Sequence, residues 1–467
     1  MRFHFSGICG AGMGNVAMLL AEAGHEVKGS DERFFPPMSD ELRARGIPIL
    51  EGYKAENLMA LFTPDVQVIT NALSRDHVEA AGGRERGWRV LSFPEVLEEF
   101  ILPGRKVFVV AGTHGKTTTT SLLARLLESE GAGWLVGGVL RSGEPGCRLG
   151  QPKAPFAIEG DEYGTSWFDP RAKFLHYRPR WALLTHLEWD HLDIYPSFAA
   201  MQEPFRELLR LVPGEGGLIY CSDVPELRKL VEPFAGRKIA YGTDASADFR
   251  LARVISQDAR GSRVVFAEGG REVELETPLA GGIYLMNLLG AAAAARTAGV
   301  GWEEIGRRAR DLYGAKRRLE PLRRGDPFHL YSDFAHHPTA VRETLKVLRE
   351  LHPGAPLWAI FDPRNASSRR NAFHALYAEV FRWADRVILG PPHPDAKLAD
   401  DQRMDVKKLA ADIGRQAQGC SSERELRACF QEPVPPGTVL AVMSCGAFFG
   451  LPGELAKSTD GRVEIKG

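Results

Sequence analysis

A chain of 467 residues is long enough for about three domains of ordinary size, and its 44% hydrophobic content can fill their cores. The formal net charge of −1, from 59 basic and 60 acidic residues, argues against a protein that binds nucleic acid or anionic membranes. The sequence has no signal-peptide core and no membrane-length apolar run, and its 6 cysteines form no C-x-x-C pair, so we expect a cytoplasmic protein without a cysteine metal site.

The first predicted unit, residues 1–104, alternates short apolar runs with helical stretches, the pattern of a parallel sheet covered by helices. Its loop "GICGAGMGN" follows the first strand and opens a helix, where backbone N–H groups can bind a diphosphate. Asn15 stands where a dinucleotide-binding loop has its third glycine, so a strand–helix turn without a ligand stays an alternative. The candidate binding residues of this unit are Gly7, Gly10, Gly12, Met13, Gly14 and Asp31.

The second unit, residues 105–314, opens with the apolar run "KVFVV" and the loop "AGTHGKTTTT". The loop is similar to a P-loop, but Val110 stands where that motif has its outer glycine. Its amides favour binding of β- and γ-phosphates, with Lys116 as the counter-charge and the Thr117 hydroxyl placed for Mg²⁺. The candidate ATP-binding residues of the loop are Gly112, Thr113, His114, Gly115, Lys116, Thr117 and Thr118.

Two further predicted strands of this unit, "FAIEGDE" and "WALLTHLEWDH", end in acidic residues and histidine. Ligands of open α/β sheets bind beyond the carboxyl ends of strands, so we expect these ends and the phosphate loop to line one crevice. Mg²⁺ in such a site needs ligands besides the loop. We predict Thr117, Glu159 and His191 as metal ligands, and a solvated acidic turn around Asp161 and Glu162 is the alternative.

The third unit, residues 315–467, again alternates predicted strands with helices: strands at "HLYSDF", "LWAIFD", "DRVILG" and "TVLAVMS", and a helix at "TAVRETLKVLRELH". In its loop "FDPRNASSRR", Arg364 and Asn365 are candidates for binding carboxylates, and a solvated basic loop is the alternative. The whole chain is predicted as α/β, with a Rossmann-like N-terminal domain, a central P-loop ATPase-like domain and a Rossmann-like C-terminal domain.

In order and approximate spacing, the stretches "GTHGKTTT", "EGDEY", "LEWDHLDIY" and "SDFAHHPTAV" resemble the motifs of the Mur ligase family, ATP-dependent amide-forming enzymes of peptidoglycan metabolism. The resemblance covers nearly the whole chain. The segments "GSDERFFPPMS", "DEYGTSWFDPRAKFLHYRP" and "FDPRN" look most like the branch that couples an intact peptide in peptidoglycan recycling. This resemblance implies joining of the lactyl carboxylate of UDP-N-acetylmuramate to the amino group of L-alanyl-γ-D-glutamyl-meso-diaminopimelate, through an acyl phosphate.

The resemblance also implies a role for each domain and for single residues. The N-terminal loop would bind the uridine diphosphate, the central domain ATP and Mg²⁺, and the C-terminal domain the murein tripeptide through the Arg-Asn pair of "FDPRN". Lys116, His191 and Arg318 would be the catalytic residues, with Arg318 reaching the γ-phosphate. Asn287 would contact the adenine and Asp333 the ribose. We expect a monomer or a weak homo-oligomer.

The sequence departs from the family pattern at several positions. The resemblance implies a first magnesium held by Thr117 and Glu159 and a second held by His191. Phe205 stands where members with a carboxylated lysine have that lysine, which leaves the second magnesium without one ligand. Ile283 and Tyr284 replace a usual His-Asn pair on the adenine side. His186 and Cys445 each stand where relatives commonly have asparagine.

Three alternatives to a tripeptide ligase stay open. The first, in the same family, is the ligase that adds free L-alanine to UDP-N-acetylmuramate. The second is a P-loop ATPase switch or binding module, which would leave the first glycine loop and the third unit without a use. The third, a dehydrogenase, would use the first loop alone.

Overall fold

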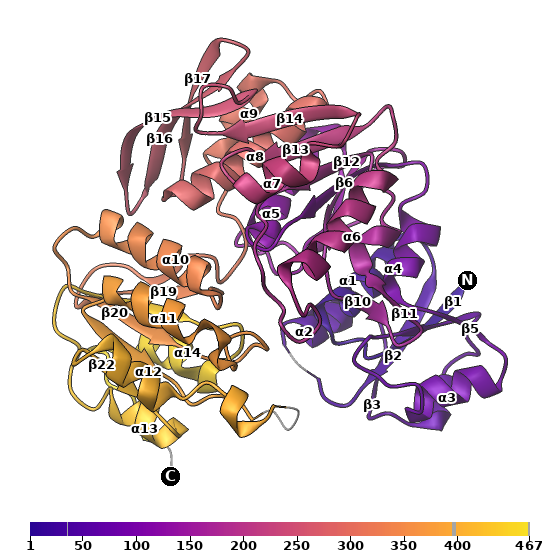
Figure 1. Cartoon of the computed structure of the whole chain (residues 1–467). Helices are drawn as coiled ribbons and strands as arrows, with labels where there is room; N and C mark the ends of the chain where they lie inside the picture. The colour runs from indigo at the N-terminus through magenta and orange to yellow at the C-terminus, as the bar shows by residue number, and fades with distance from the viewer. Residues whose placement is uncertain (35, 395–397, 466–467) are drawn as a thin grey trace.

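The computed structural model describes residues 1–34, 36–394 and 398–465; Phe35, within the segment "GSDERFFPPMS", lies outside these ranges. The chain forms three lobes in sequence order, each built on its own main sheet with helices packed against it (Figure 1). This arrangement confirms the predicted α/β class with three sheet-based units.

The N-terminal lobe is a five-stranded parallel sheet in the order β3-β2-β1-β4-β5. Its elements are β1 (Arg2–Ser6), α1 (Ala11–Glu22), β2 (Glu26–Asp31), α2 (Met38–Ala44), β3 (Ile49–Glu51), β4 (Val66–Ile69), α3 (Val78–Glu85), β5 (Arg89–Leu91) and α4 (Phe93–Val96). The central strand β1 is buried, with polar side chains of His4 and Ser6 between its apolar ones. Glu79 of α3 satisfies them: its Oε2 accepts hydrogen bonds from Ser6 and Ser30 at 2.6 and 2.5 Å and lies 3.3 Å from His4 Nε2.

The central lobe has a ten-stranded sheet in the order β17-β16-β15-β14-β13-β12-β6-β9-β7-β8. Its strands are β6 (Lys106–Ala111), β7 (Gly133–Leu135), β8 (Cys147–Arg148), β9 (Pro155–Glu159), β12 (Trp181–Leu184), β13 (Gly217–Cys221), β14 (Arg237–Gly242), β15 (Phe249–Asp258), β16 (Gly261–Glu268) and β17 (Arg271–Thr277). Strand β6 pairs in parallel with β12 on one side and β9 on the other, so the carboxyl ends of these three strands are neighbours. Strands β15 to β17 extend the sheet as an antiparallel meander.

Helices cover the central sheet, and a small hairpin lies apart from it (Figure 1). These elements are α5 (Lys116–Leu126), the hairpin β10 (Gly164–Ser166) and β11 (Asp169–Ala172), α6 (Phe198–Leu211), α7 (Pro225–Val231), α8 (Gly282–Thr297) and α9 (Trp302–Ala309). Helix α8 contains a run of alanines from 291 to 295, all fully buried. Their small side chains allow α8 to pack closely on α5, the helix that follows the phosphate loop.

The C-terminal lobe has a six-stranded sheet in the order β18-β19-β23-β20-β21-β22, parallel except for β18. Its elements are β18 (Glu320–Arg323), β19 (Phe328–Asp333), α10 (Pro338–Leu351), β20 (Leu357–Phe361), α11 (His374–Val380), β21 (Arg386–Leu389), α12 (Val406–Ile413), β22 (Ala417–Gly419), α13 (Glu423–Ala428), β23 (Thr438–Met443) and α14 (Leu451–Lys457). All four strands and the helix predicted here from sequence are present.

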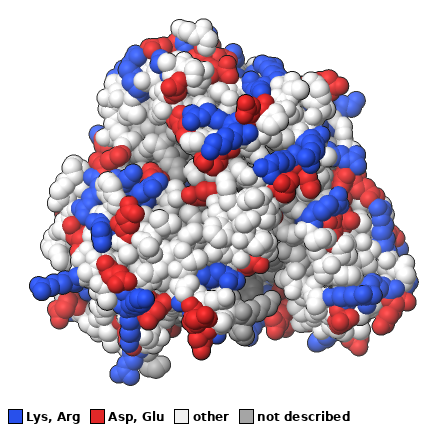
Figure 2. Space-filling view, viewed as in Figure 1, with Lys and Arg blue, Asp and Glu red and all other residues white. Residues whose placement is uncertain are grey.

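The predicted division of the chain at 104/105 and 314/315 falls between the three main sheets and stays a prediction. On the face shown in Figure 2, basic and acidic side chains alternate without a large area of one sign, as the balanced composition leads one to expect. Within the described ranges, every helix is too short or too polar to cross a bilayer.

Candidate active site

A cavity of about 880 Å³ opens where the three lobes meet. It lies at the carboxyl ends of β6, β9 and β12, which confirms the prediction that these ends and the phosphate loop line one crevice. Most of the predicted ATP-binding and metal-binding residues line it, namely Thr113, His114, Gly115, Lys116, Thr117, Thr118, Glu159, His191, Asn287, Arg318 and Asp333.

The phosphate loop connects β6 to α5 and requires glycine at two positions. Gly112 has φ +136° and Gly115 has φ +81°, values that residues with a side chain rarely adopt. A Cβ atom at Gly115 would also lie 2.6 Å from Asn287 Oδ1, because the loop packs directly on α8. Helix α5 begins at Lys116, so the unpaired N–H groups of its first turn are available to an anion in the cavity.

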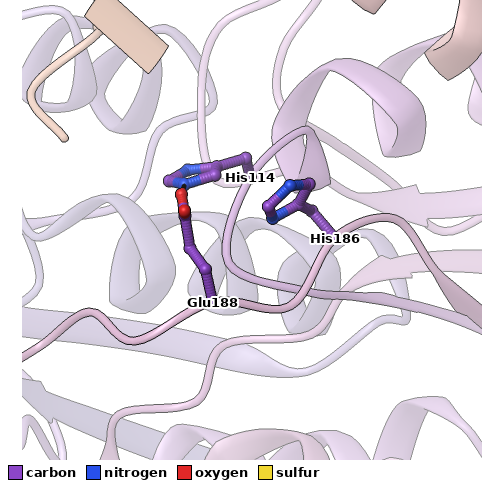
Figure 3. Close-up of side chains that lie close together, drawn as sticks. All are labelled: His114, His186 and Glu188. Atoms are coloured by element: carbon purple, nitrogen blue, oxygen red, sulfur yellow. Dashed lines mark hydrogen bonds and ion pairs between the residues drawn. The ribbon is translucent and has the colours of Figure 1, made fainter. Parts of the chain in front are cut away.

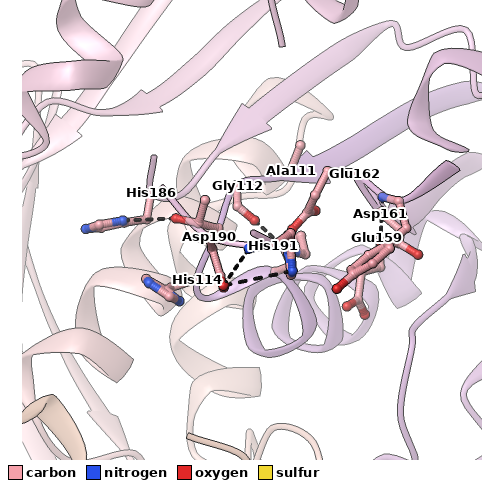
Figure 4. Close-up of polar contacts among 12 residues, drawn as sticks. Ala111, Gly112, His114, Glu159, Asp161, Glu162, His186, Asp190 and His191 are labelled. Carbon is pink, nitrogen blue, oxygen red and sulfur yellow. Dashed lines mark hydrogen bonds and ion pairs between the residues drawn. The ribbon is translucent and has the colours of Figure 1, made fainter. Parts of the chain in front are cut away.

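Lys116, Glu162 and His191 form a buried charged group beside the loop; Figure 4 shows Glu162 and His191 within it. Lys116 Nζ donates hydrogen bonds to Gly112 O at 2.7 Å and Glu162 Oε1 at 2.8 Å, and His191 Nε2 lies 2.6 Å from the same Oε1. Burial disfavours the Lys116 ammonium, but the Glu162 charge outweighs this and raises the pKa of Lys116. Burial likewise disfavours the Glu162 carboxylate, yet Lys116 and His191 lower its pKa to about 2. Lys116 is therefore held charged beside the phosphate loop.

Thr117 and Glu159 lie together as the metal prediction requires. Thr117 Oγ1 donates to Glu159 Oε1 at 2.7 Å, while Glu159 Oε2 accepts the Gly137 N–H at 2.6 Å. Arg318 Nη2 reaches Thr117 Oγ1 at 3.0 Å. Nearby, Glu162 Oε2 and His191 Nδ1 are buried without a hydrogen-bond partner among the described residues. The Thr117 hydroxyl and the Glu159 carboxylate are a donor pair that fits Mg²⁺, and these unsatisfied atoms of Glu162 and His191 belong to residues that line the same cavity.

His191 is held in a strained backbone conformation, with φ +54°. The preceding residue, Asp190, explains how this conformation is kept: its Oδ1 accepts the His191 N–H at 2.7 Å and the Ser367 hydroxyl at 2.6 Å. Ser367 belongs to the loop "FDPRNASSRR" of the C-terminal lobe. The position of His191 therefore depends on contact between the central and C-terminal lobes.

Asp333, the predicted ribose contact, lies at the end of β19 with both carboxylate oxygens engaged. Oδ2 accepts hydrogen bonds from the Tyr284 hydroxyl at 2.9 Å and the Leu319 N–H at 2.6 Å, and Oδ1 accepts the Ala335 N–H at 2.7 Å. The Tyr284 contact joins α8 of the central lobe to the C-terminal lobe. Tyr284 therefore connects the two lobes at the position where the usual family residue is replaced.

The N-terminal glycine loop follows β1 and opens α1, as predicted, but the residues predicted to bind the diphosphate do not line the cavity. Helix α1 begins at Ala11, so three predicted residues lie inside it. The side chains that reach the cavity from this lobe belong to other residues, including Cys9, Asn15 and Met18. Asp31 supports the loop by accepting the Cys9 N–H at 2.8 Å. The predicted residues that do not line the cavity are Gly7, Gly10, Gly12, Met13, Gly14 and Asp31, together with Gly112 of the phosphate loop.

Arg364 and Asn365, the predicted peptide-binding pair, also lie outside the lining of the cavity. Arg364 Nη1 is 3.4 Å from His393 Nε2, and its side chain contacts Gly446. Asn365 Oδ1 accepts the Ser368 N–H at 2.9 Å and shapes the loop. The structure thus places the pair in the C-terminal lobe, in the same loop as Ser367.

The structure shows the contacts around two of the positions that depart from the family pattern, Phe205 and Cys445. Phe205 is fully buried in α6, with its ring centroid 5.4 Å from that of Phe174, so this position belongs to the core. Cys445 lies between Ser444 and Gly446, whose carbonyl groups both accept hydrogen bonds from the Arg317 guanidinium. That contact orients the segment that precedes Arg318.

Sequence reasoning missed three residues on which this geometry depends. Glu162 was not named as a site residue, and a solvated acidic turn was the alternative for it; an acid three positions after Glu159 was the available signal. Ser367 carried no signal, because its partner Asp190 is 177 positions away. Tyr284 was noted only as a departure from the family.

Comparison with known protein families gives one match for each of the three lobes. Models of the Mur ligase family catalytic domain, the Mur ligase middle domain and the Mur ligase glutamate ligase domain match residues 2–104, 156–295 and 317–446. The chain is 34% identical to the UDP-N-acetylmuramate–L-alanyl-γ-D-glutamyl-meso-2,6-diaminoheptandioate ligase of Escherichia coli K12, over 97% of this chain and 96% of that protein. This chain belongs to the Mur ligase family.

Solved structures agree with this membership. The crystal structure of a murein peptide ligase from Psychrobacter arcticus matches the Mur ligase with a TM-score of 0.73 and 31% identity, over 96% of this chain and 97% of that one. Among sequence relatives, the UDP-N-acetylmuramate–L-alanine ligase of Rhizobium etli is 30% identical to this chain, over 98% of this chain and 97% of that protein. As a Mur ligase, the protein is an ATP-dependent ligase, which decides against the P-loop switch and the dehydrogenase.

Proposed function

We propose that this Mur ligase joins the lactyl carboxylate of UDP-N-acetylmuramate to the amino group of L-alanyl-γ-D-glutamyl-meso-diaminopimelate, with cleavage of ATP, in peptidoglycan recycling. The observation that carries the proposal is the cavity at the meeting point of the three lobes, which brings the phosphate loop together with residues of the N-terminal and C-terminal lobes. Relatives named for the tripeptide substrate reach 34% identity, and relatives named for L-alanine reach 32%.

Lys116 and the amides of the phosphate loop bind the β- and γ-phosphates in this proposal. The Lys116 ammonium is already charged and oriented by Glu162, so it needs little rearrangement to meet a phosphate. Arg318, 3.0 Å from Thr117 Oγ1, brings a second positive charge to the γ-phosphate from the C-terminal lobe. Phosphoryl transfer depends mainly on such positioning and charge neutralisation, which is why the site needs no nucleophilic side chain.

Thr117, Glu159 and His191 are the proposed magnesium ligands. When bound, Mg²⁺ would neutralise charge on the phosphate oxygens during transfer to the sugar carboxylate. Glu162, with its buried and unsatisfied Oε2, is a further ligand candidate that the sequence did not single out. Its oxygen is proposed to make up for the ligand that this chain lacks, because Phe205 stands where some family members have a carboxylated lysine.

The uridine diphosphate, the adenosine of ATP and the tripeptide are assigned to the following residues in this proposal. The N-terminal lobe faces the cavity with Cys9, Asn15 and Met18, and the helix after its glycine loop is proposed to bind the uridine diphosphate. Asn287 and Asp333 are proposed to contact adenine and ribose. Arg364 and Asn365 are proposed to bind the tripeptide when the C-terminal lobe closes on its substrates. The amine then attacks the acyl phosphate, and its proton is proposed to pass to His191 or to a neighbouring carboxylate.

An acceptor comparison tests this proposal. ADP release is measured with UDP-N-acetylmuramate present and with tripeptide, tetrapeptide or L-alanine as the acceptor. We expect release to require the sugar nucleotide and kcat/KM to be highest with the tripeptide. A preference for L-alanine would make the protein an alanine ligase, and release without the sugar nucleotide would remove the ligase assignment.

A further inference from the structure

Three side chains with metal-ligating atoms meet beside the phosphate loop and outside the magnesium set, as Figure 3 shows, and a third histidine adjoins them. His114, His186 and Glu188 each offer one ligand atom, and these atoms lie within 4.8 Å of one another. His337 adds a third imidazole, with Nδ1 3.0 Å from Glu188 Oε1. We call these residues, His114, His186, Glu188 and His337, the histidine cluster.

The histidine cluster joins two lobes. His114 lies in the loop between β6 and α5, and His186 and Glu188 follow β12, all in the central lobe. His337 is the N-cap residue of α10 in the C-terminal lobe. The rings of His114 and His337 are 5.0 Å apart between centroids, and those of His114 and His186 are 5.1 Å apart. Three imidazoles from separate segments thus converge on one carboxylate.

Hydroxyl groups behind the cluster hold its members in place. Thr113 Oγ1 lies 3.2 Å from His186 Nδ1 and accepts the Glu188 N–H at 3.2 Å. Thr339 Oγ1 donates to Glu188 Oε2 at 2.9 Å. Metal-binding imidazoles and carboxylates are commonly oriented by such outer hydrogen bonds.

The contacts of His337 leave a conflict that a cation would remove. Its Nδ1 accepts the Thr339 N–H at 3.4 Å and also faces Glu188 Oε1. A nitrogen that accepts this N–H has no proton to give to the carboxylate. The other nitrogen, Nε2, is buried without a hydrogen-bond partner among the described residues.

We propose that the histidine cluster binds one divalent transition-metal ion of the Zn²⁺ class. Imidazole nitrogens combined with a carboxylate oxygen, as in His114, His186 and Glu188, are typical of Zn²⁺ and Co²⁺, whereas Mg²⁺ prefers oxygen ligands and water. His337, next to Glu188, is the fourth ligand in this proposal. The bound ion fastens α10 of the C-terminal lobe to the phosphate loop. This site is separate from the magnesium ligands of the proposed reaction.

Metal binding to the full chain tests the proposal. The protein is stripped with a chelator and titrated with Co²⁺, whose visible absorption reports four-coordinate binding, and Zn²⁺ is then used as a competitor. We expect one Co²⁺ per chain, displacement by Zn²⁺ and no displacement by excess Mg²⁺. His186→Asn and His337→Asn should each weaken Co²⁺ binding by more than about tenfold, the size of effect seen when metal sites lose supporting groups.

The matched control is His374→Asn. His374 is also paired with a carboxylate, Asp412 at 2.7 Å, but lies outside the cluster, so its replacement should leave Co²⁺ affinity unchanged. Circular dichroism verifies that each variant is folded. X-ray absorption of the Zn²⁺-loaded wild-type chain identifies the ligands of the ion directly, so it tests the proposal even if a variant does not fold. Fewer than two imidazole ligands, no binding by the wild type, or full binding by both folded variants would overturn the proposal.

Discussion

At the scale of single residues, the proposed phosphoryl transfer depends most on Lys116. Its ammonium is buried, charged and directed at the phosphate loop by Glu162 and Gly112 O. Lys116→Ala should abolish turnover, because the phosphates lose their principal counter-charge, while the far-ultraviolet circular dichroism stays that of the wild type. Steady-state kinetics check this. Turnover within about tenfold of wild type, about 1.4 kcal/mol of transition-state stabilisation, would show that Lys116 does not have this role.

The pKa values of Glu79 and His4 predict that the N-terminal lobe loses stability as the pH falls. Burial disfavours the charged form of Glu79, but hydrogen bonds from His4, Ser30 and Ser6 outweigh this and lower the pKa of Glu79 below 4.5. Burial lowers the pKa of His4 below 6.5. Both groups bind protons more readily in the unfolded chain, so both contributions to stability are complete above about pH 6.5. The contribution of His4 is lost first as the pH falls, and that of Glu79 follows below 4.5.

Calorimetry of Glu79→Gln checks this pH dependence. The temperature of the first melting transition of the wild type should fall steadily from pH 7 to pH 3, and the variant should show a weaker fall below pH 4.5. Glu85→Gln, on the same helix but exposed, should keep the wild-type dependence. Identical curves for Glu79→Gln and the wild type would contradict the assignment.

At the scale of elements, the contact between the phosphate loop and α8 is the critical one. Gly115→Ala should raise the Kd for ATP by at least about tenfold, because the new Cβ meets Asn287 Oδ1 and the loop must move. Isothermal titration calorimetry measures this. Gly24→Ala is the matched control: its φ of +86° gives similar backbone strain, but a Cβ there meets no atom within 4 Å. Equal losses of ATP affinity in both variants would show that general strain, and not the contact, is responsible.

The elements differ in how far the sequence predicted them. The strands that lead into the site were predictable because they are continuous apolar runs that end in polar residues, as "KVFVV" before Gly112 shows. The antiparallel meander β15–β17 was missed because its outer strands are partly exposed and rich in charged residues. The N-terminal glycine residues were predicted from a motif, but α1 begins one residue after Gly10 and presents other side chains to the cavity.

At the scale of the whole molecule, the site exists only where lobes touch. Tyr284→Phe removes the hydrogen bond to Asp333 and with it one of the contacts between the central and C-terminal lobes. A hydrogen bond to a charged group contributes about 1.5–3 kcal/mol, so we expect the KM for ATP to rise by about tenfold or more with a smaller change in kcat. Tyr313→Phe, an exposed tyrosine, is the control. An unchanged KM in Tyr284→Phe would mean that this contact does not position the nucleotide.

The same dependence on long-range contacts explains what the sequence could not reveal. Motif spacing located Lys116, Thr117 and Glu159, because each lies at the end of a predicted strand or the start of a helix. It could not locate Ser367 against Asp190, since that pairing arises only from the arrangement of two folded lobes. The histidine cluster has the same origin.

The central claim is that the sugar carboxylate is activated as an acyl phosphate before the peptide amine attacks it. UDP-N-acetylmuramate labelled with ¹⁸O in the lactyl carboxylate tests this directly, with unlabelled ATP and tripeptide. Phosphorylation of one carboxylate oxygen and expulsion of phosphate by the amine should leave one ¹⁸O in the inorganic phosphate and one in the new amide, as measured by mass spectrometry. Inorganic phosphate without label, formed together with the amide product, would contradict the account.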